Sequence, residues 1–277
     1  MTGSIKEASG IQTYGQLHTA FFQQNLKTDQ VVTEYNSHEK QPAASLGKLF
    51  IVAVALKIVE DEVLDLQQRY HITPYEYQEN MHGTGRLKVE FLPLWAMSKA
   101  VRRDMLPTKT LEDLLRYSIQ FSDNVAIAKV ADVAGRNRIQ DVLSNWHLHD
   151  TTILNLESGT LNETTAQNVG QFLYEFRKGF LVRDNYLGQK FLRWIPTRKT
   201  ATASGQEVTV RHKDGNITQD GFSYCHQAGY LQSIDRRYIE HSFVALTSDK
   251  AVSDKDSTYP QQARVREMVE DMVHQLS

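Results

Sequence analysis

The sequence has 277 residues, of which 40% are hydrophobic and 23% charged, and its formal net charge is -2. These values are typical of an ordinary globular protein with enough residues for a large core and one or two domains. A charge this close to zero gives no electrostatic reason to expect a nucleic acid or an anionic membrane as a partner. The single cysteine, Cys225, excludes an internal disulfide and any multi-cysteine metal site.

Targeting and metal-binding signals are missing from the sequence as it stands. Residues 1–10 hold no apolar run, and no apolar stretch reaches membrane-spanning length. We therefore expect no signal peptide and no membrane span, and a cytoplasmic, monomeric protein. The ten histidines show no H-x-x-x-H or HExxH spacing, so we expect no metal and no cofactor.

Hydrophobic spacing predicts the elements in chain order. The first half contains a helix at Ile11–Asn25, a strand at Gln30–Tyr35, a central apolar helix that begins near Ser45, an irregular connection at Leu64–Pro93, and helices at Leu94–Val101, Thr110–Phe121, Val125–Ala134 and Arg138–Trp146. The second half contains helices at Thr165–Phe176 and Gly188–Ile195, strands at Glu207–Lys213, Ser223–Leu231 and Arg237–Thr247, and a helix at Ala263–Leu276.

This order predicts a fold of the α/β (α+β) class. One strand precedes a mostly helical block and three strands follow it, so we expect an antiparallel sheet built from both chain ends and flanked by terminal helices. The predicted sheet domain comprises residues 1–40 and 197–277, and an inserted all-helical domain comprises residues 41–196. We expect the active site in the cleft between them, where small-molecule pockets commonly form.

A serine and a lysine open the central helix. Ser45 and Lys48 are three residues apart, so on a helix they share a face about one turn apart. The following residues, Leu49–Val59, are apolar on almost all sides, which is typical of a buried helix. At the start of such a helix, unpaired N–H groups favour developing negative charge, and a hydroxyl with an amine within reach fits an activated nucleophile. Alone, this spacing is more often a serine helix cap followed by an unrelated lysine.

Two further polar motifs follow. Ser122-Asp123-Asn124 lies in a short break between two predicted helices, where such residues usually cap the second helix. His212-Lys213-Asp214-Gly215 lies at the end of a predicted strand, and by itself it is a charged strand end before a turn.

Taken together and in order, S45-L-G-K48, S122-D-N124 and K213-D-G215 resemble the S-x-x-K, S-D-N and K-T-G motifs of class A β-lactamases and penicillin-binding proteins. The resemblance extends to four further segments, Gly83–Leu87, Thr110–Gly135, Thr164–Ala166 and Ser242–Ser248. It therefore covers nearly the whole chain. It implies a β-lactamase/transpeptidase-like fold and a small-molecule substrate. Proteins of this family are usually exported, which differs from the expectation based on the missing leader.

The resemblance also implies a role for each catalytic residue. Ser45 would be the acylating nucleophile, and Lys48 would accept its proton directly or through water. Ser122 would relay a proton to the leaving nitrogen, and Lys213 would keep that region positive. Two ammonium groups in one confined site lower each other's pKa, and a neutral Lys48 is what a general base requires.

The same resemblance implies the substrate-binding groups. The oxyanion hole would consist of the backbone N–H groups of Ser45 and Asn216, which follows Gly215. Asn124 would tie the two lobes and hold the lysine of the first motif, and Asp123 would be a structural cap.

The sequence departs from the family pattern in its third motif. Asp214 stands where the family has Thr or Ser, whose hydroxyl helps to hold the substrate carboxylate. If this carboxylate faced the cleft it would repel an anionic β-lactam; alternatively it pairs with Lys213 or His212, or faces away. The following strand holds no Arg or Lys for the substrate carboxylate, and His226 is the nearest candidate.

The loop that carries the deacylating glutamate of class A enzymes is also changed. Glu157 and Leu161 are one residue further apart than in the family's E-x-x-L-N pattern, and the span from Asn162 to Thr164 is shorter. If Glu157 cannot position a hydrolytic water, the enzyme would acylate and then turn over slowly, as penicillin-binding proteins do.

Three functional hypotheses follow. The first is a serine β-lactamase that hydrolyses the β-lactam amide through an acyl-enzyme on Ser45. The second is a D-Ala-D-Ala-type peptidase or esterase with slow deacylation, favoured by the changed loop around Glu157. The third is a non-catalytic binding protein that keeps the fold, favoured by Asp214 and by the missing leader.

Overall fold

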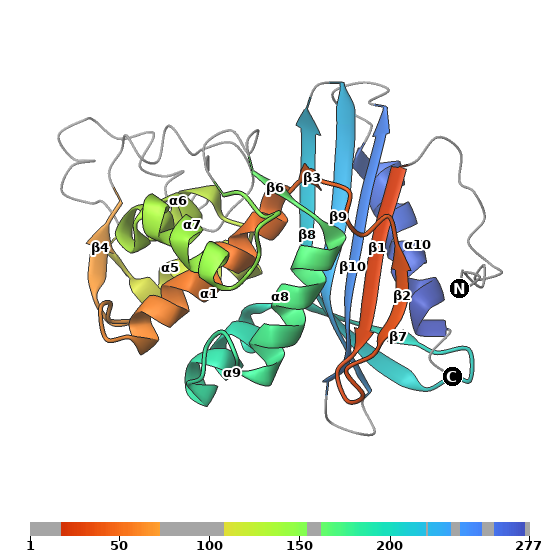
Figure 1. Cartoon of the computed structure of the whole chain (residues 1–277), viewed down its shortest axis with the longest axis horizontal. Helices are drawn as coiled ribbons and strands as arrows, with labels where there is room; N and C mark the ends of the chain where they lie inside the picture. The colour runs from red at the N-terminus through yellow and green to blue at the C-terminus, as the bar shows by residue number, and fades with distance from the viewer. Residues whose placement is uncertain are drawn as a thin grey trace.

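The computed structural model describes residues 18–72, 108–153, 162–219, 221–233, 239–250 and 258–274. Its main feature is a six-stranded antiparallel sheet with helices on both faces (Figure 1). A layer of helices from the middle of the chain lies against one face, and α10, near the carboxyl end, lies against the other (Figure 1). The fold class predicted from the sequence is thereby confirmed.

The strands of the main sheet come from both parts of the chain. Their spatial order is β2-β1-β10-β9-β8-β7. Their bounds are His18–Asn25 (β1), Val31–Tyr35 (β2), Thr197–Ala201 (β7), Glu207–Gln219 (β8), Phe222–Ser233 (β9) and Ile239–Lys250 (β10). The described residues also form two short strand pairs, β3 (Gln41–Pro42) with β6 (Glu163–Thr164) and β4 (Arg69–His71) with β5 (Thr108–Thr110).

The predicted helix at Ile11–Asn25 is wrong over residues 18–25, which form β1. The side chains of Phe21 and Phe22 point to opposite faces of the sheet, and each is buried in a different core. A strand covered on both faces has consecutive apolar residues, which periodicity alone cannot distinguish from a helical segment. Residues 11–17 lie outside the described part of the chain.

The helices of the middle segment follow the sequence prediction closely. Those in the described part of the chain are α1 (Gly47–Glu60), α5 (Leu111–Gln120), α6 (Asn124–Ala134), α7 (Arg136–Asn145), α8 (Ala166–Lys178) and α9 (Asn185–Trp194), with α10 (Thr258–His274) after the last strand. Caps explain several of their starts, because Thr110, Asp123 and Thr165 each accept a backbone N–H from the first turn of the helix that follows. The helix predicted at Leu94–Val101 lies outside the described residues.

The buried apolar residues of the described segments form two hydrophobic cores. The larger core surrounds α1, which is buried on nearly all sides, and includes the sheet residues Phe22, Tyr230 and Leu246. The smaller core lies between the other sheet face and α10. Because the larger core contains residues of both the helical segment and the sheet, it fixes α1 against the strands.

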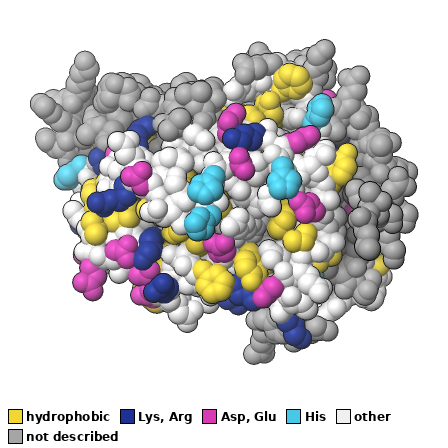
Figure 2. Space-filling model, viewed as in Figure 1, with side chains coloured by type: hydrophobic (Ala, Val, Ile, Leu, Met, Phe, Trp, Pro, Cys, Tyr) yellow, Lys and Arg dark blue, Asp and Glu magenta, His cyan; other side chains and the backbone are white. Residues whose placement is uncertain are grey.

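Figure 2 shows cationic and anionic side chains interspersed over one face of the molecule, with histidines near its centre. Within the described residues, no helix is long and apolar enough to cross a membrane.

Candidate active site

The predicted nucleophile lies on a 3₁₀ turn, Ala44–Leu46, that leads directly into α1. Ala44, the residue before Ser45, has φ of +47°, in the left-handed region that side chains other than glycine rarely adopt. Such a conformation persists only where surrounding contacts hold it, and it is common at active sites.

Ser122 lies in the break between α5 and α6, as the sequence predicts. Its φ of +54° is also in the left-handed region. Asp123 accepts a hydrogen bond from the N–H of Ala126 at 2.9 Å and so caps α6. This cap fixes the residue on each side of it, and Asn124 begins the helix.

Lys48 contacts the Ser122–Asn124 break directly. Its side chain is buried, with 6% of the residue exposed, and its Nζ donates to the carbonyl oxygen of Ser122 at 2.5 Å and to Oδ1 of Asn124 at 2.6 Å. Desolvation, with a smaller effect of the Lys213 charge, lowers the pKa of Lys48 well below its ordinary value. Lys48 is therefore suited to accept a proton.

The Ser122 hydroxyl joins three side chains from distant parts of the sequence. Its Oγ lies 3.0 Å from Ser45 Oγ, 3.1 Å from Lys48 Nζ and 2.9 Å from Lys213 Nζ. Lys213 is 3% exposed, and desolvation lowers its pKa to about 8. The structure thus brings together the four residues that the motifs suggested as catalytic.

The edge of β8 runs past the nucleophile. Strand β7 pairs with residues 207–211 of β8, and the N–H of His212 donates to the carbonyl oxygen of Pro196 at 2.9 Å on the same edge. N–H groups two residues apart point in the same direction in a strand, so the N–H of Asn216 points away from β9 and out of this edge. A Cβ on Gly215 would lie 3.2 Å from the backbone N of Leu46, so glycine lets the edge approach the Ser45 turn closely.

Asp214 lies on the other face of the sheet from the lysine before it. Its Oδ1 accepts from Gln227 Nε2 at 2.9 Å, and its Oδ2 lies 3.6 Å from His212 Nε2. The Lys213 ammonium contacts the carbonyl oxygen of Asp214, at 2.8 Å, rather than its carboxylate. The pairing with His212 was one of the possibilities left open by the sequence. Gln227 was not predicted from the sequence. It could have been found, because Asp214 and Gln227 lie at equal distances from the turn between β8 and β9 and therefore pair across the two strands.

His226 does not fit the substrate-binding role suggested from the sequence. It is 2% exposed; its Nε2 donates to the carbonyl oxygen of Pro42 at 2.8 Å and its Nδ1 accepts from the N–H of Thr247 at 3.3 Å. Both ring nitrogens are therefore used inside the protein, and burial lowers the pKa of His226 to about 4, so the ring is neutral. The expectation that His226 binds a substrate carboxylate is therefore wrong, because its ring has no free donor to offer one. Glu157, the residue suggested for deacylation, lies outside the described part of the chain.

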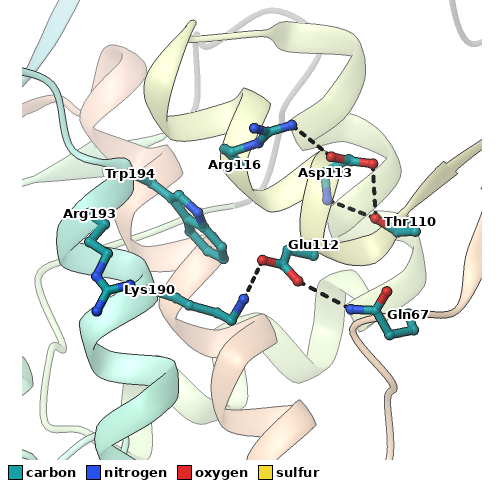
Figure 3. A pocket seen from close by; sticks show the side chains of 8 residues that line it. All are labelled: Gln67, Thr110, Glu112, Asp113, Arg116, Lys190, Arg193 and Trp194. Atoms are coloured by element: carbon teal, nitrogen blue, oxygen red, sulfur yellow. Dashed lines mark hydrogen bonds and ion pairs between the residues drawn. The ribbon is translucent and has the colours of Figure 1, made fainter.

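A separate pocket of about 460 Å³ lies between α5 and α9 (Figure 3). It is lined by Gln67, Thr110, Glu112, Asp113, Arg116, Lys190, Arg193 and Trp194. Four of its charged groups form two ion pairs, Lys190 with Glu112 and Arg116 with Asp113 (Figure 3). None of the residues suggested by the motifs lines it, so we do not assign the reaction to this pocket.

The structure combines an antiparallel sheet, a buried helix that follows a serine on a 3₁₀ turn, and two buried lysines around a second serine. These features belong together in the β-lactamase/transpeptidase fold, and solved structures confirm the fold. A protein named PBP-A is 18% identical, with a TM-score of 0.74, and the match covers 96% of this chain and 92% of that one. A class A β-lactamase from Bacteroides cellulosilyticus DSM 14838 is 17% identical, with a TM-score of 0.72 and coverage of 94% and 92%. A β-lactamase from Chitinophaga pinensis DSM 2588 is 18% identical, with a TM-score of 0.71 and coverage of 92% and 93%.

Residues 4–267 match the sequence profile of the Beta-lactamase enzyme family, and the chain belongs to that family. It is thus a serine hydrolase of the β-lactamase type. No curated protein matches the sequence closely enough to refine this assignment.

Proposed function

We propose that the chain hydrolyses β-lactams, or closely related amides and esters, through an acyl-enzyme on Ser45. The observation that carries this proposal is the set of contacts around the Ser122 hydroxyl, which lies within hydrogen-bonding distance of Ser45, Lys48 and Lys213. These three residues are 77, 74 and 91 positions away from Ser122 in the sequence, respectively. A purely structural role for Ser45 would not need two buried lysines directed at its neighbour.

The contacts define a path for the proton. Neutral Lys48 has two N–H donors and one lone pair; the carbonyl oxygen of Ser122 and Oδ1 of Asn124 take the donors, which leaves the lone pair for the Ser122 hydroxyl. As Ser45 Oγ attacks the carbonyl carbon, its proton passes to Ser122 Oγ, and the Ser122 proton passes to Lys48.

Collapse of the tetrahedral intermediate reverses this transfer. The C–N or C–O bond to the leaving group breaks, and the leaving atom takes its proton from Lys48 through Ser122. Charged Lys213 donates to Ser122 Oγ and favours negative charge there during the transfer. We assign the oxyanion hole to the backbone N–H groups of Ser45 and Asn216.

The rate of deacylation separates a β-lactamase from the second candidate, a peptidase or esterase that remains acylated. The changed spacing between Glu157 and Leu161 favours slow deacylation. The structure of a point mutant of PBP-A is described as an acyl-enzyme complex with penicillin G. We expect Ser45 to be acylated in either case.

Intact mass measured during reaction with penicillin G tests the proposal. We expect a mass increase of one penicillin, located on Ser45 by peptide mapping and absent from Ser45→Ala. Rapid return to the free mass with product formation indicates a β-lactamase, and a persistent adduct indicates the slow enzyme.

Ser144→Ala is the matched control, because this exposed serine on α7 donates to the carbonyl oxygen of Gln140 within its own helix. It should react like the wild type. Folded wild-type protein that forms no adduct and no product with penicillin G, a chromogenic cephalosporin or an activated ester would refute the proposal and favour a binding protein.

A further inference from the structure

His226 connects the centre of the sheet to the segment just before the nucleophile. It lies in β9 opposite Gly215 of β8, and paired residues of neighbouring strands point to the same face. On that face its Nε2 donates to the carbonyl oxygen of Pro42, three residues before Ser45. Its Nδ1 accepts from the N–H of Thr247 in β10, which fixes the orientation of the ring.

The segment held in this way carries backbone strain. The φ of +47° at Ala44 disfavours the observed path of the chain, by about 1 kcal/mol for a residue with a side chain. The N–H of Ala43 donates to the carbonyl oxygen of Asn162 at 2.7 Å, on the β6 side. The His226 ring holds the same segment from the sheet side, so the turn is fixed between two separate elements.

The position of the turn decides the alignment of Ser45. Its Oγ must stay 3.0 Å from Ser122 Oγ, and its N–H must reach the oxyanion hole that we propose at the edge of β8. A displacement of about 1 Å in a reacting group can reduce a rate by about 100-fold. Pro42 has no N–H with which to bind a neighbour, and its carbonyl oxygen is the group that the sheet holds.

We propose that His226 is a positioning residue for the nucleophile: its hydrogen bond to Pro42 fixes the strained turn so that Ser45 meets Ser122 and the edge of β8. This inference rests on the proposed role of Ser45. The low pKa of His226 agrees with it, since a ring that stays neutral keeps one donor and one acceptor in place across the neutral pH range.

Two conservative variants separate the two hydrogen bonds of the ring. In His226→Gln, the longer amide side chain can still donate to Pro42. In His226→Asn, the amide oxygen can replace Nδ1 and accept from Thr247, but the side chain is too short to reach Pro42. We expect His226→Asn to lower the acylation rate constant at saturating penicillin G by tenfold or more, with little change in the half-saturating concentration, and His226→Gln to stay within threefold of wild type.

His241→Asn is the control for loss of a buried histidine from the sheet. His241 lies at the other end of β10 and contacts Gln23 at 3.5 Å. This variant should lower the melting temperature without changing the acylation rate. Amide exchange of the peptide covering residues 41–50 should be faster in His226→Asn than in His226→Gln and unchanged in His241→Asn.

The outcomes separate this inference from the proposed function. If wild-type Ser45 is not acylated by any probe, the proposed function fails first. If wild-type Ser45 is acylated and folded His226→Asn reacts at the rate of His226→Gln, the positioning role is overturned. Should His226→Asn not fold, His226→Gln decides: retention within threefold supports the role, and a tenfold loss in folded protein overturns it.

Discussion

Lys48 and Lys213 contact the same hydroxyl, but the proposed mechanism requires opposite charge states of them. In that mechanism Lys48 is neutral when it accepts a proton, and Lys213 is charged when it stabilises negative charge on Ser122. Burial lowers the pKa of both, and that of Lys213 to about 8. The pair is therefore functional in a pH window whose upper limit is set by Lys213.

The acylation rate should accordingly fall as pH rises through about 8, because Lys213 loses its charge there. Lys213→Arg keeps the positive charge at every accessible pH, so it should remove this alkaline decline, although at a lower maximal rate. Stopped-flow acylation between pH 6 and pH 10 measures the effect. An alkaline decline that persists unchanged in Lys213→Arg would assign it to another group.

The buried charge of Lys213 also affects stability. Its pKa in the folded state, about 8, is below the ordinary 10.5, so the folded protein is destabilised while the group is charged in both states, by about 3 kcal/mol below pH 8. This destabilisation decreases as pH rises from about 8 to 10.5.

Lys213→Met should therefore raise the free energy of unfolding by about 1–3 kcal/mol at pH 7 while abolishing acylation, and the gain should shrink by pH 10. Urea unfolding at both pH values measures this. Lys199→Met is the control, because this exposed lysine pairs with Glu207 at the surface and its removal should change stability by less than about 0.5 kcal/mol.

Asp214 should have little influence on which substrates react. Its carboxylate lies on the sheet face opposite the Lys213 side chain and accepts a hydrogen bond from Gln227, so it does not face a carboxylate of a substrate bound at Ser45. We expect Asp214→Asn to change the acylation rates of penicillin G and of penicillin G methyl ester by less than about twofold, because an exposed charge on the far side is screened. Selective acceleration of penicillin G would show that the carboxylate acts on the substrate charge.

At the scale of elements, two helix glycines have opposite environments. A Cβ on Gly170 of α8 would lie 2.1 Å from Cδ1 of the buried Phe22, whereas a Cβ on Gly188 of α9 would meet none of the described residues within 4 Å. Gly170→Ala should therefore destabilise by about 1–3 kcal/mol through overpacking. Gly188→Ala should stabilise by about 0.5–1 kcal/mol, as expected for alanine in a helix. Thermal unfolding of the two variants, each of which replaces a helix glycine by alanine, tests whether α8 packs on β1 as described.

The helices could be predicted because their caps and apolar spacing are local signals. Thr110 and Asp123 cap α5 and α6 where the sequence suggests. Strand β1 could not be predicted, because its hydrogen-bonding partner β10 lies more than 200 residues away in the chain. Strand β7 is a short polar edge strand, and its sequence TRKTA lacks the alternation of apolar residues that predicts a strand.

The candidate site likewise contains one part that could be predicted from the sequence and one part that could not. The ordered motifs suggested that Ser45, Lys48, Ser122 and Lys213 belong to one site. The structure places their side chains in contact, although no local sequence signal connects the three motifs. The contacts of His226 could not be predicted, because they depend on the register of β9 and on the path of the chain at Pro42.

At the scale of the whole molecule, the helical segment and the sheet share a single large core. Ala20, Phe22, Tyr230 and Val244 of the sheet belong to the same core as α1. We propose that residues 1–40 and 197–277 form one domain and residues 41–196 form another. The two are distinct in chain topology, but they do not fold independently of each other. A fragment of residues 41–196 should lack cooperative thermal unfolding, because it exposes this shared core. Calorimetry of the fragment and the full chain tests this, and a sharp fragment transition would contradict it.

The placement of β1 between β2 and β10 has a consequence for biosynthesis. The ribosome releases Ser45, Lys48 and Ser122 early, but Lys213 and the strands that hold it follow only in the last third of the chain. β10 then has to settle between β1 and β9 before the sheet is continuous. A truncated or stalled nascent chain therefore carries the serine without its second ammonium, and in the proposed mechanism acyl transfer can begin only when translation is nearly finished.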